Sequence, residues 1–451
     1  MNSETAILTT GQMKNLQSIA VNVFNIPDID ITGKKQAHKL ATDYLELRTI
    51  YLPEELKTKT DSFRKKPKKD LKDYFNHYKV YDFFNLIKTA YPYRFWDVNP
   101  KFNKDGEFVK YEYAVNNKHL YNFLARNGFY RYETESEKDG YFYIKIDGNI
   151  VRKIEPKRIR DFINVFIETR NPDVELMNTF LRTNQLNETS LSNLPFIKID
   201  FADFDKETQW MFFLNATYKV TKDAITEYKP GEVEKFVWEE EVINHKVKKL
   251  PDFFSVAPFS HIENRQLDFD LTIHNNDCLV LRYITNTCRM FWREELESRV
   301  EGVEEKEQDE YKILHRFTKE DEHLMNGLPK GEWEEYRKKN QFEIAGPLLT
   351  ERERHEQQMH LINKLFGVGF SLHRHREAGK AWSLWGMDAK NSDGNESHGG
   401  SGKSLFPNLL HSQKLIRSQY REWRNKKLTE NPHFWEGCDK HTDLLIVDDC
   451  Y

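Results

Sequence analysis

Two stretches near the C-terminus determine the fold that we expect: Glu396-Ser-His-Gly-Gly-Ser-Gly-Lys-Ser404 and Leu444-Leu-Ile-Val-Asp-Asp449. The first places glycines ahead of a lysine and a serine. Only glycine lets a backbone approach phosphate oxygens in the conformations that such a turn requires. The second has four apolar residues followed by two aspartates, which is the pattern of a buried parallel strand ending in carboxylates. Together they predict a phosphate site with a metal ion beside it.

The expected phosphate loop gives each residue type a task. Backbone N–H groups surround the phosphates, the lysine reaches the β- and γ-phosphates, and the serine hydroxyl ligates Mg²⁺. Apolar residues follow at Leu405-Phe406 and Leu409-Leu410, which predicts a helix directly after the loop. Ser397 stands where the full motif has a glycine, and an ordinary glycine loop with a solvated lysine is the alternative. The expected nucleotide-binding residues are Gly399, Gly400, Ser401, Gly402, Lys403 and Ser404.

Composition favours a multidomain protein of the cytoplasm. A chain of 451 residues has room for two or three domains, and 14 % aromatic residues supply large cores. The net charge of −4 gives no overall argument for nucleic-acid binding. Four cysteines without paired spacing favour a reducing compartment. Since no run approaches the roughly 20 apolar residues of a membrane span, we expect a soluble, cytoplasmic protein with no membrane partner.

The chain divides into four regions that together predict a mixed α/β and α+β multidomain fold. Residues 1–75 read as short helices and a linker that ends in the basic run Phe63–Lys69. This run is either solvated or a contact to a nucleic-acid backbone. Residues 76–250 read as an aromatic-rich α+β domain, and residues 251–375 as a helical domain. Residues 376–451 read as the N-terminal half of a P-loop nucleotide-binding domain.

Several elements are predicted in the α+β region. Lys118–Asn127 has a helical apolar face, and Tyr141–Arg152 alternates around Asp147-Gly148, a pair that favours a tight hairpin turn. A second helix follows, because apolar residues recur at helical spacing from Ile159 to Ile167. This order of helix, hairpin and helix is either plain scaffolding or a DNA-contacting module.

Further elements are expected beyond residue 253, where the chain looks mainly helical. Tyr283–Val300 and Thr350–His373 are predicted helices, and Ala381–Trp385 a strand. Gly367 and Gly369 are expected to loosen the end of the second helix. Its expected apolar stripe consists of Met359, Ile362, Leu365 and Phe366.

Three other groups of residues could bind a metal or carry a functional charge. Asp200, Asp203 and Asp205 resemble the metal-binding aspartates of archaeo-eukaryotic-type primases, but aspartates in loops commonly cap turns. Cys438, His441 and Cys450 do not have the spacing of a zinc site. His373 and His375 follow a helix, where a cation interacts favourably with the helix dipole.

With these motifs in hand, the chain resembles the primase-helicase family proteins of bacterial mobile elements and phages, relatives of the superfamily 3 and poxvirus-type helicases. The specific likeness lies in the last 60 or so residues. The stretches that carry the resemblance are Leu361-Ile-Asn-Lys-Leu-Phe-Gly-Val-Gly-Phe370, Trp385-Gly-Met-Asp388, Gly399-Gly-Ser-Gly-Lys-Ser-Leu-Phe406 and Asp443-Leu-Leu-Ile-Val-Asp-Asp449, together with the looser Asn127-Gly-Phe-Tyr-Arg-Tyr132 and Phe212-Phe-Leu-Asn215.

The resemblance implies an ATP-dependent replicative DNA helicase that uses Mg²⁺, assembles as a ring, expected to be a hexamer, and translocates on single-stranded DNA. It implies that Lys403 contacts the phosphates and Ser404 and Asp448 hold Mg²⁺. Asp449 would orient or deprotonate the attacking water. The residue types and spacing of the two motifs, taken without the resemblance, predict the same four roles.

The sequence ends at Tyr451, two residues after the aspartates. A P-loop core needs further strands, so we expect this chain to be an incomplete form that does not unwind DNA by itself. Two alternatives stay open at this point. One is a non-catalytic DNA-binding or replisome-adaptor protein with a structural P-loop remnant, and the other is a P-loop kinase for a small molecule.

Overall fold

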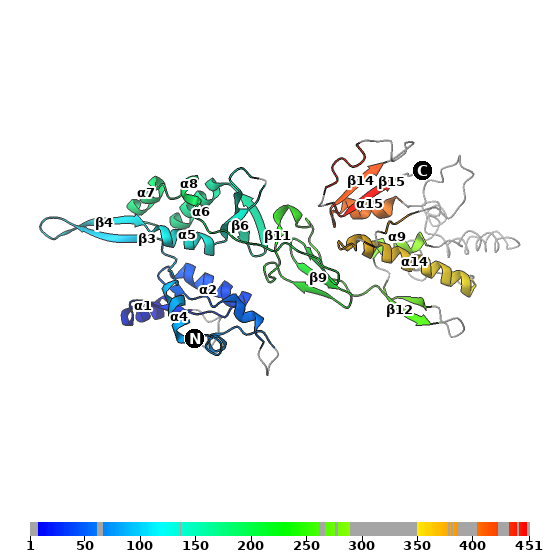
Figure 1. Cartoon of the computed structure of the whole chain (residues 1–451), viewed down its shortest axis with the longest axis horizontal. Helices are drawn as coiled ribbons and strands as arrows, with labels where there is room; N and C mark the ends of the chain where they lie inside the picture. Colours follow the sequence, from blue (N-terminus) through cyan, green and yellow to red (C-terminus); the bar gives the residue numbers. More distant parts are fainter. Residues whose placement is uncertain are drawn as a thin grey trace, which may run out of the picture. The chain divides into compact units, whose positions relative to one another are not determined.

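The computed structural model describes residues 8–60, 66–135, 137–260, 267–275, 278–288, 350–377, 379, 382–386, 404–422, 433–439 and 442–448. The fold is mixed α/β with several small sheets (Figure 1). The chain forms two compact units. Unit 1 contains the described residues up to Asp203, with Trp210–Lys219 and Ile225–Val242. Unit 2 contains Phe204–Gln209, Val220–Ala224 and the described residues from Ile243 onward.

The N-terminal part of unit 1 is a small helical layer with its own core of Ile29, Leu52, Leu56 and Tyr74. Lys69, at the end of the predicted basic run, forms ion pairs of 2.8 Å and 2.7 Å with Asp28 and Asp30, so this lysine is used inside the fold. The elements are α1 (Thr10–Ile19), β1 (Phe24–Asn25), α2 (Ile31–Asp43), β2 (Arg48–Thr49), the 3₁₀ helix η1 (Glu54–Thr58), α3 (Leu71–Phe75) and α4 (Val80–Lys88).

A four-stranded sheet forms the centre of unit 1, with the strand order β11-β7-β6-β5. The predicted helices and hairpin are confirmed as α5, α6 and the β6–β7 pair, and Gly148 takes the positive φ of +62° that the hairpin turn requires. The elements are α5 (Asn117–Arg126), β5 (Phe129–Glu133), β6 (Tyr141–Asp147), β7 (Ile150–Ile154), α6 (Pro156–Glu168), α7 (Val174–Arg182), α8 (Glu188–Leu191) and β11 (Val237–Trp238).

Aromatic rings fill the core of unit 1. The rings of Phe123 and Phe166 lie 4.5 Å apart between their centroids, and those of Phe95 and Phe123 lie 4.7 Å apart. Ile159 and Ile163 of α6 are fully buried in the same cluster, as their helical spacing predicted. A second aromatic contact lies beside the sheet, where Trp238 stacks on Phe201 at 4.6 Å and 17°.

Two further β structures complete this part of the chain. A three-stranded sheet has the order β10-β9-β8, and a separate hairpin pairs β3 with β4. No prediction from the sequence covered the hairpin. The strands are β3 (Trp96–Phe102), β4 (Phe108–Val115), β8 (Thr208–Phe212), β9 (Thr217–Thr221) and β10 (Ile225–Tyr228). A short 3₁₀ helix η2 (Glu239–Glu241) follows β11.

The part of unit 2 that follows Ile243 starts with an antiparallel hairpin of β12 (Phe254–Ser260) and β13 (Leu267–Ile273). The sequence did not predict this hairpin within the region expected to be mainly helical, although Leu267-Asp-Phe-Asp-Leu-Thr-Ile273 alternates with the period of a strand. The helix expected from Tyr283 to Val300 is confirmed only as far as Asn286. The observed helix α9 starts earlier, at Leu279, and ends at Asn286. Residues 289–349 lie outside the described part of the chain.

Helix α14 (Glu351–Leu372) matches the prediction at both ends, with a capping box of Thr350 and Glu353 and with His373 as its C-cap. Its expected stripe needs correction, because Leu361 is fully buried whereas Phe366 is 56 % exposed. The helix also continues through Gly367 and Gly369. Gly367 lies on the buried face, where a Cβ atom would stand 3.6 Å from the side chain of Leu384.

The C-terminal part contains α15 (Leu405–Ser412) and two parallel strands, β14 (Ser418–Glu422) and β15 (Leu444–Asp448). The helix after the loop and the strand before the aspartates are therefore confirmed. The strand expected at Ala381–Trp385 is not, because residues 382–386 have no regular structure. Trp382 instead stacks on Phe370 of α14, at 5.9 Å between ring centroids.

Candidate functional site

The site is built on Ser404, the residue that precedes α15. A serine in this position usually accepts a hydrogen bond from a backbone N–H of the first helical turn. Ser404 makes no such capping bond. Its Oγ instead donates to Oδ1 of Asp448 at 2.7 Å, across 44 positions of the sequence. The last residue of the first motif, Ser404, and the first aspartate of the second, Asp448, are therefore in direct contact.

Asp448 receives a second hydrogen bond, from a residue that the sequence did not single out. The hydroxyl of Tyr420 in β14 donates to Oδ2 at 2.5 Å, so each carboxylate oxygen accepts from one hydroxyl. Burial raises the pKa of Tyr420, and the bond to Asp448 raises it further. Because its pKa is raised, Tyr420 remains a neutral phenol that donates to Asp448. The hydroxyls of Tyr420 and Ser404 together fix the orientation of the Asp448 carboxylate.

The strand arrangement places these groups where open α/β sheets bind ligands. Strands β14 and β15 run parallel, with Glu422 opposite Asp448 at their carboxyl ends. Helix α15 presents its N-terminus at the same place through the Ser404–Asp448 bond. Ligands of open parallel sheets bind outside the carboxyl ends of the strands, and helix N-termini favour anions.

The remaining predicted site residues lie outside the described part of the chain. These are Gly399, Gly400, Ser401, Gly402, Lys403 and Asp449. Of the expected nucleotide and metal residues, the structure therefore brings together Ser404 and Asp448.

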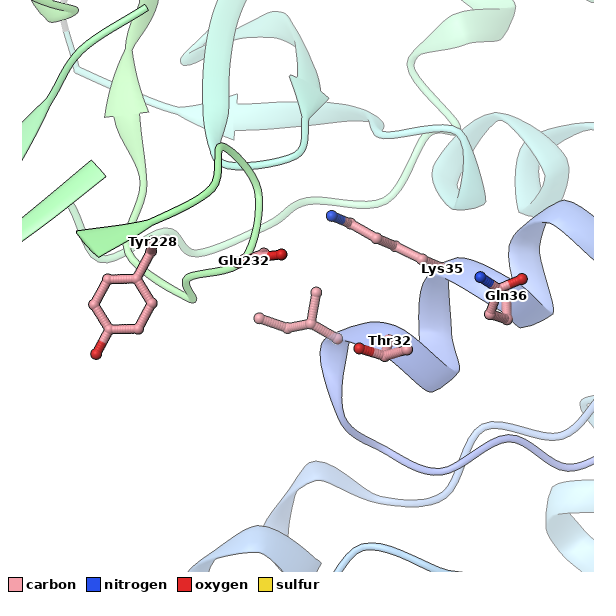
Figure 2. Close-up of a pocket in the computed structure, with 6 residues that line it drawn as sticks. Thr32, Lys35, Gln36, Tyr228 and Glu232 are labelled. Carbon is pink, nitrogen blue, oxygen red and sulfur yellow. The ribbon is translucent and has the colours of Figure 1, made fainter. Parts of the chain in front are cut away.

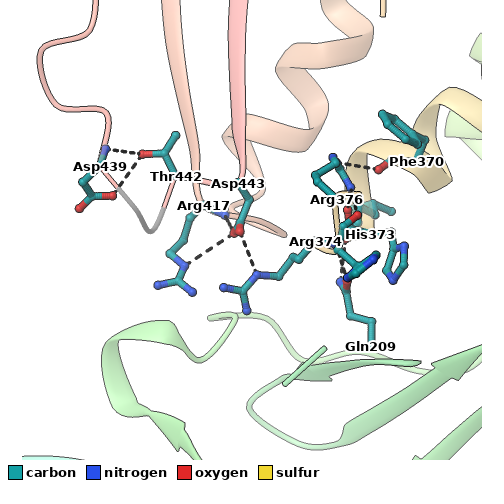
Figure 3. A network of polar contacts seen from close by, with 11 residues as sticks. Gln209, Phe370, His373, Arg374, Arg376, Arg417, Asp439, Thr442 and Asp443 are labelled. Carbon is teal, nitrogen blue, oxygen red and sulfur yellow. Dashed lines mark hydrogen bonds and ion pairs between the residues drawn. The ribbon is translucent and has the colours of Figure 1, made fainter. Parts of the chain in front are cut away.

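A polar network fixes the opposite end of β15 (Figure 3). Asp443, just before the strand, accepts from Nε of Arg374 at 3.0 Å and from the backbone N–H of Arg417 at 3.3 Å. Both the Arg374 and Asp443 side chains are largely buried. The side chain of Gln209 accepts from the backbone N–H of Arg374 and donates to the carbonyl of Leu372, each at 2.7 Å. The end of α14 and the starts of both strands are therefore held together.

The other groups of candidate residues have structural partners. Oδ1 of Asp200 accepts from the backbone N–H of Ala202, and its carboxylate pairs with Lys235 at 3.0 Å. Asp205 accepts from the N–H of Thr208 and caps the turn before β8. No group of three or more His, Cys, Asp or Glu residues suited to a metal exists among the described residues. Cys438 is a free thiol, while His441 and Cys450 lie outside the described residues.

Unit 1 contains an open pocket of about 340 Å³ (Figure 2). Helix α2 contributes Ile31, Thr32, Lys35 and Gln36, and the chain around the end of β10 contributes Tyr228 and Glu232. One lysine and one glutamate face this space. Their opposite charges favour no particular class of ligand. The Ser404–Asp448 site is therefore the stronger candidate for a functional site.

Comparisons with protein-family models, with curated proteins and with solved structures found no match. The helices of the described residues include none with the length and apolar character needed to cross a membrane.

Proposed function

We propose that residues 404–448 form the metal end of a Mg²⁺–ATP site in a P-loop ATPase. The observation that carries the proposal is the 2.7 Å bond from Ser404 to Asp448. Ser404 does not cap its helix, and its hydroxyl contacts the aspartate at the end of β15. In P-loop proteins a serine hydroxyl and an aspartate hold the same Mg²⁺, so this arrangement supports the proposal.

The donor set fits the metal. Mg²⁺ prefers hydroxyl, carboxylate and water oxygens, and it is usually bound through one or two protein carboxylates plus phosphates. Ser404 and Asp448 would hold it, and Tyr420 would keep Asp448 oriented. When bound, Mg²⁺ neutralises charge on the phosphates. By the motif, Lys403 would bind the phosphate oxygens and Asp449 would orient the attacking water.

More specifically, the proposed ATPase is a replicative DNA helicase of the superfamily 3 type. Its support is the resemblance of the C-terminal motifs to primase-helicase family proteins. In that proposal ATP hydrolysis drives translocation on single-stranded DNA within a homo-oligomeric ring.

The test is equilibrium binding of a fluorescent ATP analogue to the chain, with and without Mg²⁺. Lys403→Ala should weaken binding at least tenfold, which corresponds to about 1.4 kcal/mol. Ser404→Ala should reduce the gain in affinity that Mg²⁺ provides. Ser412→Ala is the matched control, because this serine lies at the far end of the same helix and bonds only locally, to the carbonyl of Leu409.

One outcome favours the non-catalytic adaptor instead. The Ser404–Asp448 bond also ties α15 to β15 in the absence of metal. If Ser404→Ala lowers the melting temperature while wild type and Lys403→Ala show no Mg²⁺-dependent binding, the contact is structural. DNA binding that persists in both chains would then point to a replisome adaptor.

A further inference from the structure

One face of helix α15 carries polar side chains that contact the two strands of the C-terminal sheet. Ser404, Asn408 and His411 are spaced four and three positions apart, so they lie on the same face of the helix. Ser404 contacts the end of β15. The Asn408 side chain is a hydrogen-bond partner of the Tyr420 hydroxyl, and Nδ1 of His411 lies 2.9 Å from the hydroxyl oxygen of Ser418. The helix therefore meets both strands through polar contacts.

Tyr420 is held in place by the residues around it. It lies two positions after Ser418 in β14, so both side chains point to the side of the sheet that α15 covers. Its ring lies 5.9 Å from the imidazole of His411 between centroids, at 31°. The single proton of its hydroxyl is donated to Oδ2 of Asp448 at 2.5 Å. Since Asn408 is a further partner of that hydroxyl, the O–H group is fixed in this direction.

The two carboxylate oxygens of Asp448 have different partners on different elements. Oδ1 accepts from Ser404 at the start of α15, and Oδ2 accepts from Tyr420 in β14. An ion shared by Ser404 and Asp448 would therefore meet the carboxylate at Oδ1. If both oxygens were to bind one ion, the carboxylate would have to turn and lose its bond from Tyr420. Hydrogen bonds to ionised carboxylates are among the strong ones, and the hydroxyl of the half-buried Tyr420 would be left without this acceptor.

The number of oxygens that a carboxylate offers distinguishes the common divalent cations. Ca²⁺ takes about six to eight oxygens in flexible geometry and readily binds both oxygens of one carboxylate. Mg²⁺ is smaller and demands near-ideal octahedral geometry, which the narrow angle between two oxygens of one carboxylate fits poorly. We propose that Tyr420 makes the site selective for Mg²⁺ over Ca²⁺, by keeping Asp448 to one coordinating oxygen. This inference rests on the proposed Mg²⁺–ATP site and adds to it a residue that determines metal specificity.

The test is binding of the fluorescent ATP analogue to the full chain, titrated with Mg²⁺ and separately with Ca²⁺. The quantity compared is the ratio of the two metal concentrations that give half-maximal binding. Wild type should prefer Mg²⁺, and Tyr420→Phe should reduce that preference about tenfold, as expected when a hydrogen bond that orients a metal ligand is lost. The nucleotide chelates each ion equally well in every experiment, so its own preference cancels when variants are compared.

Ser418→Ala is the matched control, because this serine lies on the same face of β14 and its hydroxyl meets His411. It should keep the wild-type ratio. A variant that folds only in part loses binding amplitude for both ions alike, so the ratio still reports on specificity. If the melting temperature shows that Tyr420→Phe does not fold, Asn408→Ala replaces it. That variant should shift the ratio in the same direction, because it frees the Tyr420 hydroxyl.

The possible outcomes separate this inference from the proposed function. An unchanged ratio in Tyr420→Phe, or a wild type that prefers neither ion, would overturn the inference and leave the proposed ATP site in place. An equal loss of affinity for both ions would also overturn it, because Tyr420 would then orient Asp448 without selecting the ion. Absence of metal-dependent nucleotide binding in wild type with either ion would overturn the proposed function and the inference together.

Discussion

His38 of α2 is a titratable side chain that is partly buried in unit 1. Its Nδ1 lies 2.8 Å from the hydroxyl of Tyr93, which is itself almost fully buried. Burial lowers the pKa of His38 below its ordinary value of 6.5, and the nearby charges of Lys145 and Arg126 lower it further. The folded state therefore favours the neutral imidazole.

This depressed pKa predicts a loss of stability in acid. The stability that His38 contributes is present above pH 6.5 and declines as the pH falls toward the lowered value, because the unfolded chain binds the proton first. Urea unfolding of unit 1 between pH 8 and pH 5 measures the decline, which His38→Gln should reduce. His360→Gln, at an exposed position of α14, is the control and should leave the slope as in wild type. Equal slopes in all three proteins would contradict the assignment.

At the level of single residues, the sequence predicted Ser404 and Asp448 but not Tyr420. The first two belong to the motifs from which the phosphate site was predicted. Tyr420 acquires its role only because β14 pairs with β15 in a particular register, with Tyr420 opposite Ile446. Nothing in the local sequence specifies that pairing across the intervening residues.

Among the elements, Gly128 determines how α5 turns into β5. Its φ of +82° is unfavourable for other residues, and a Cβ atom there would stand 2.1 Å from the carbonyl oxygen of Ile146. Gly128→Ala should therefore lower the unfolding free energy by more than the 1–2 kcal/mol or so that left-handed strain alone costs. Gly140→Ala separates the two effects, because Gly140 has a φ of +73° with no atom within 4 Å of the added Cβ.

Chemical denaturation of the two glycine variants measures this difference. Gly140→Ala should lose only the strain contribution, and Gly128→Ala at least twice as much. Equal losses would mean that the β6 backbone yields to the added methyl group.

Elements with strong local signals were predictable. The Asp147-Gly148 turn, the periodic apolar residues of α6 and the two ends of α14 all lie where the sequence placed them. The predictions failed where tertiary contacts, rather than the local sequence pattern, determine the structure. Trp382 and its neighbours read as a strand, but the indole packs on α14 rather than in a sheet.

For the whole molecule, the division into two units makes a prediction about ligand binding. A ligand that binds the folded state stabilises the unit that contains its site, by about 2.7 kcal/mol at 100 times Kd. Mg²⁺–ATP should therefore raise the unfolding transition of unit 2 and leave that of unit 1 unchanged. Thermal unfolding with and without Mg²⁺–ATP, monitored calorimetrically, tests this. An equal shift of both transitions would show that the units unfold as one.

The tryptophans of the two units differ in exposure, which affects how the unfolding transitions can be observed by fluorescence. In unit 1, Trp238 lies against Phe201 and Trp96 packs on the main core. In unit 2, the indoles of Trp382, Trp385 and Trp435 are 61 %, 75 % and 67 % exposed. Because indole emission shifts to longer wavelength in water, the tryptophans described in unit 1 should emit toward the blue edge of the fluorescence and the three described in unit 2 toward the red edge. These described tryptophans thus provide native spectral labels for the two units, without any added dye.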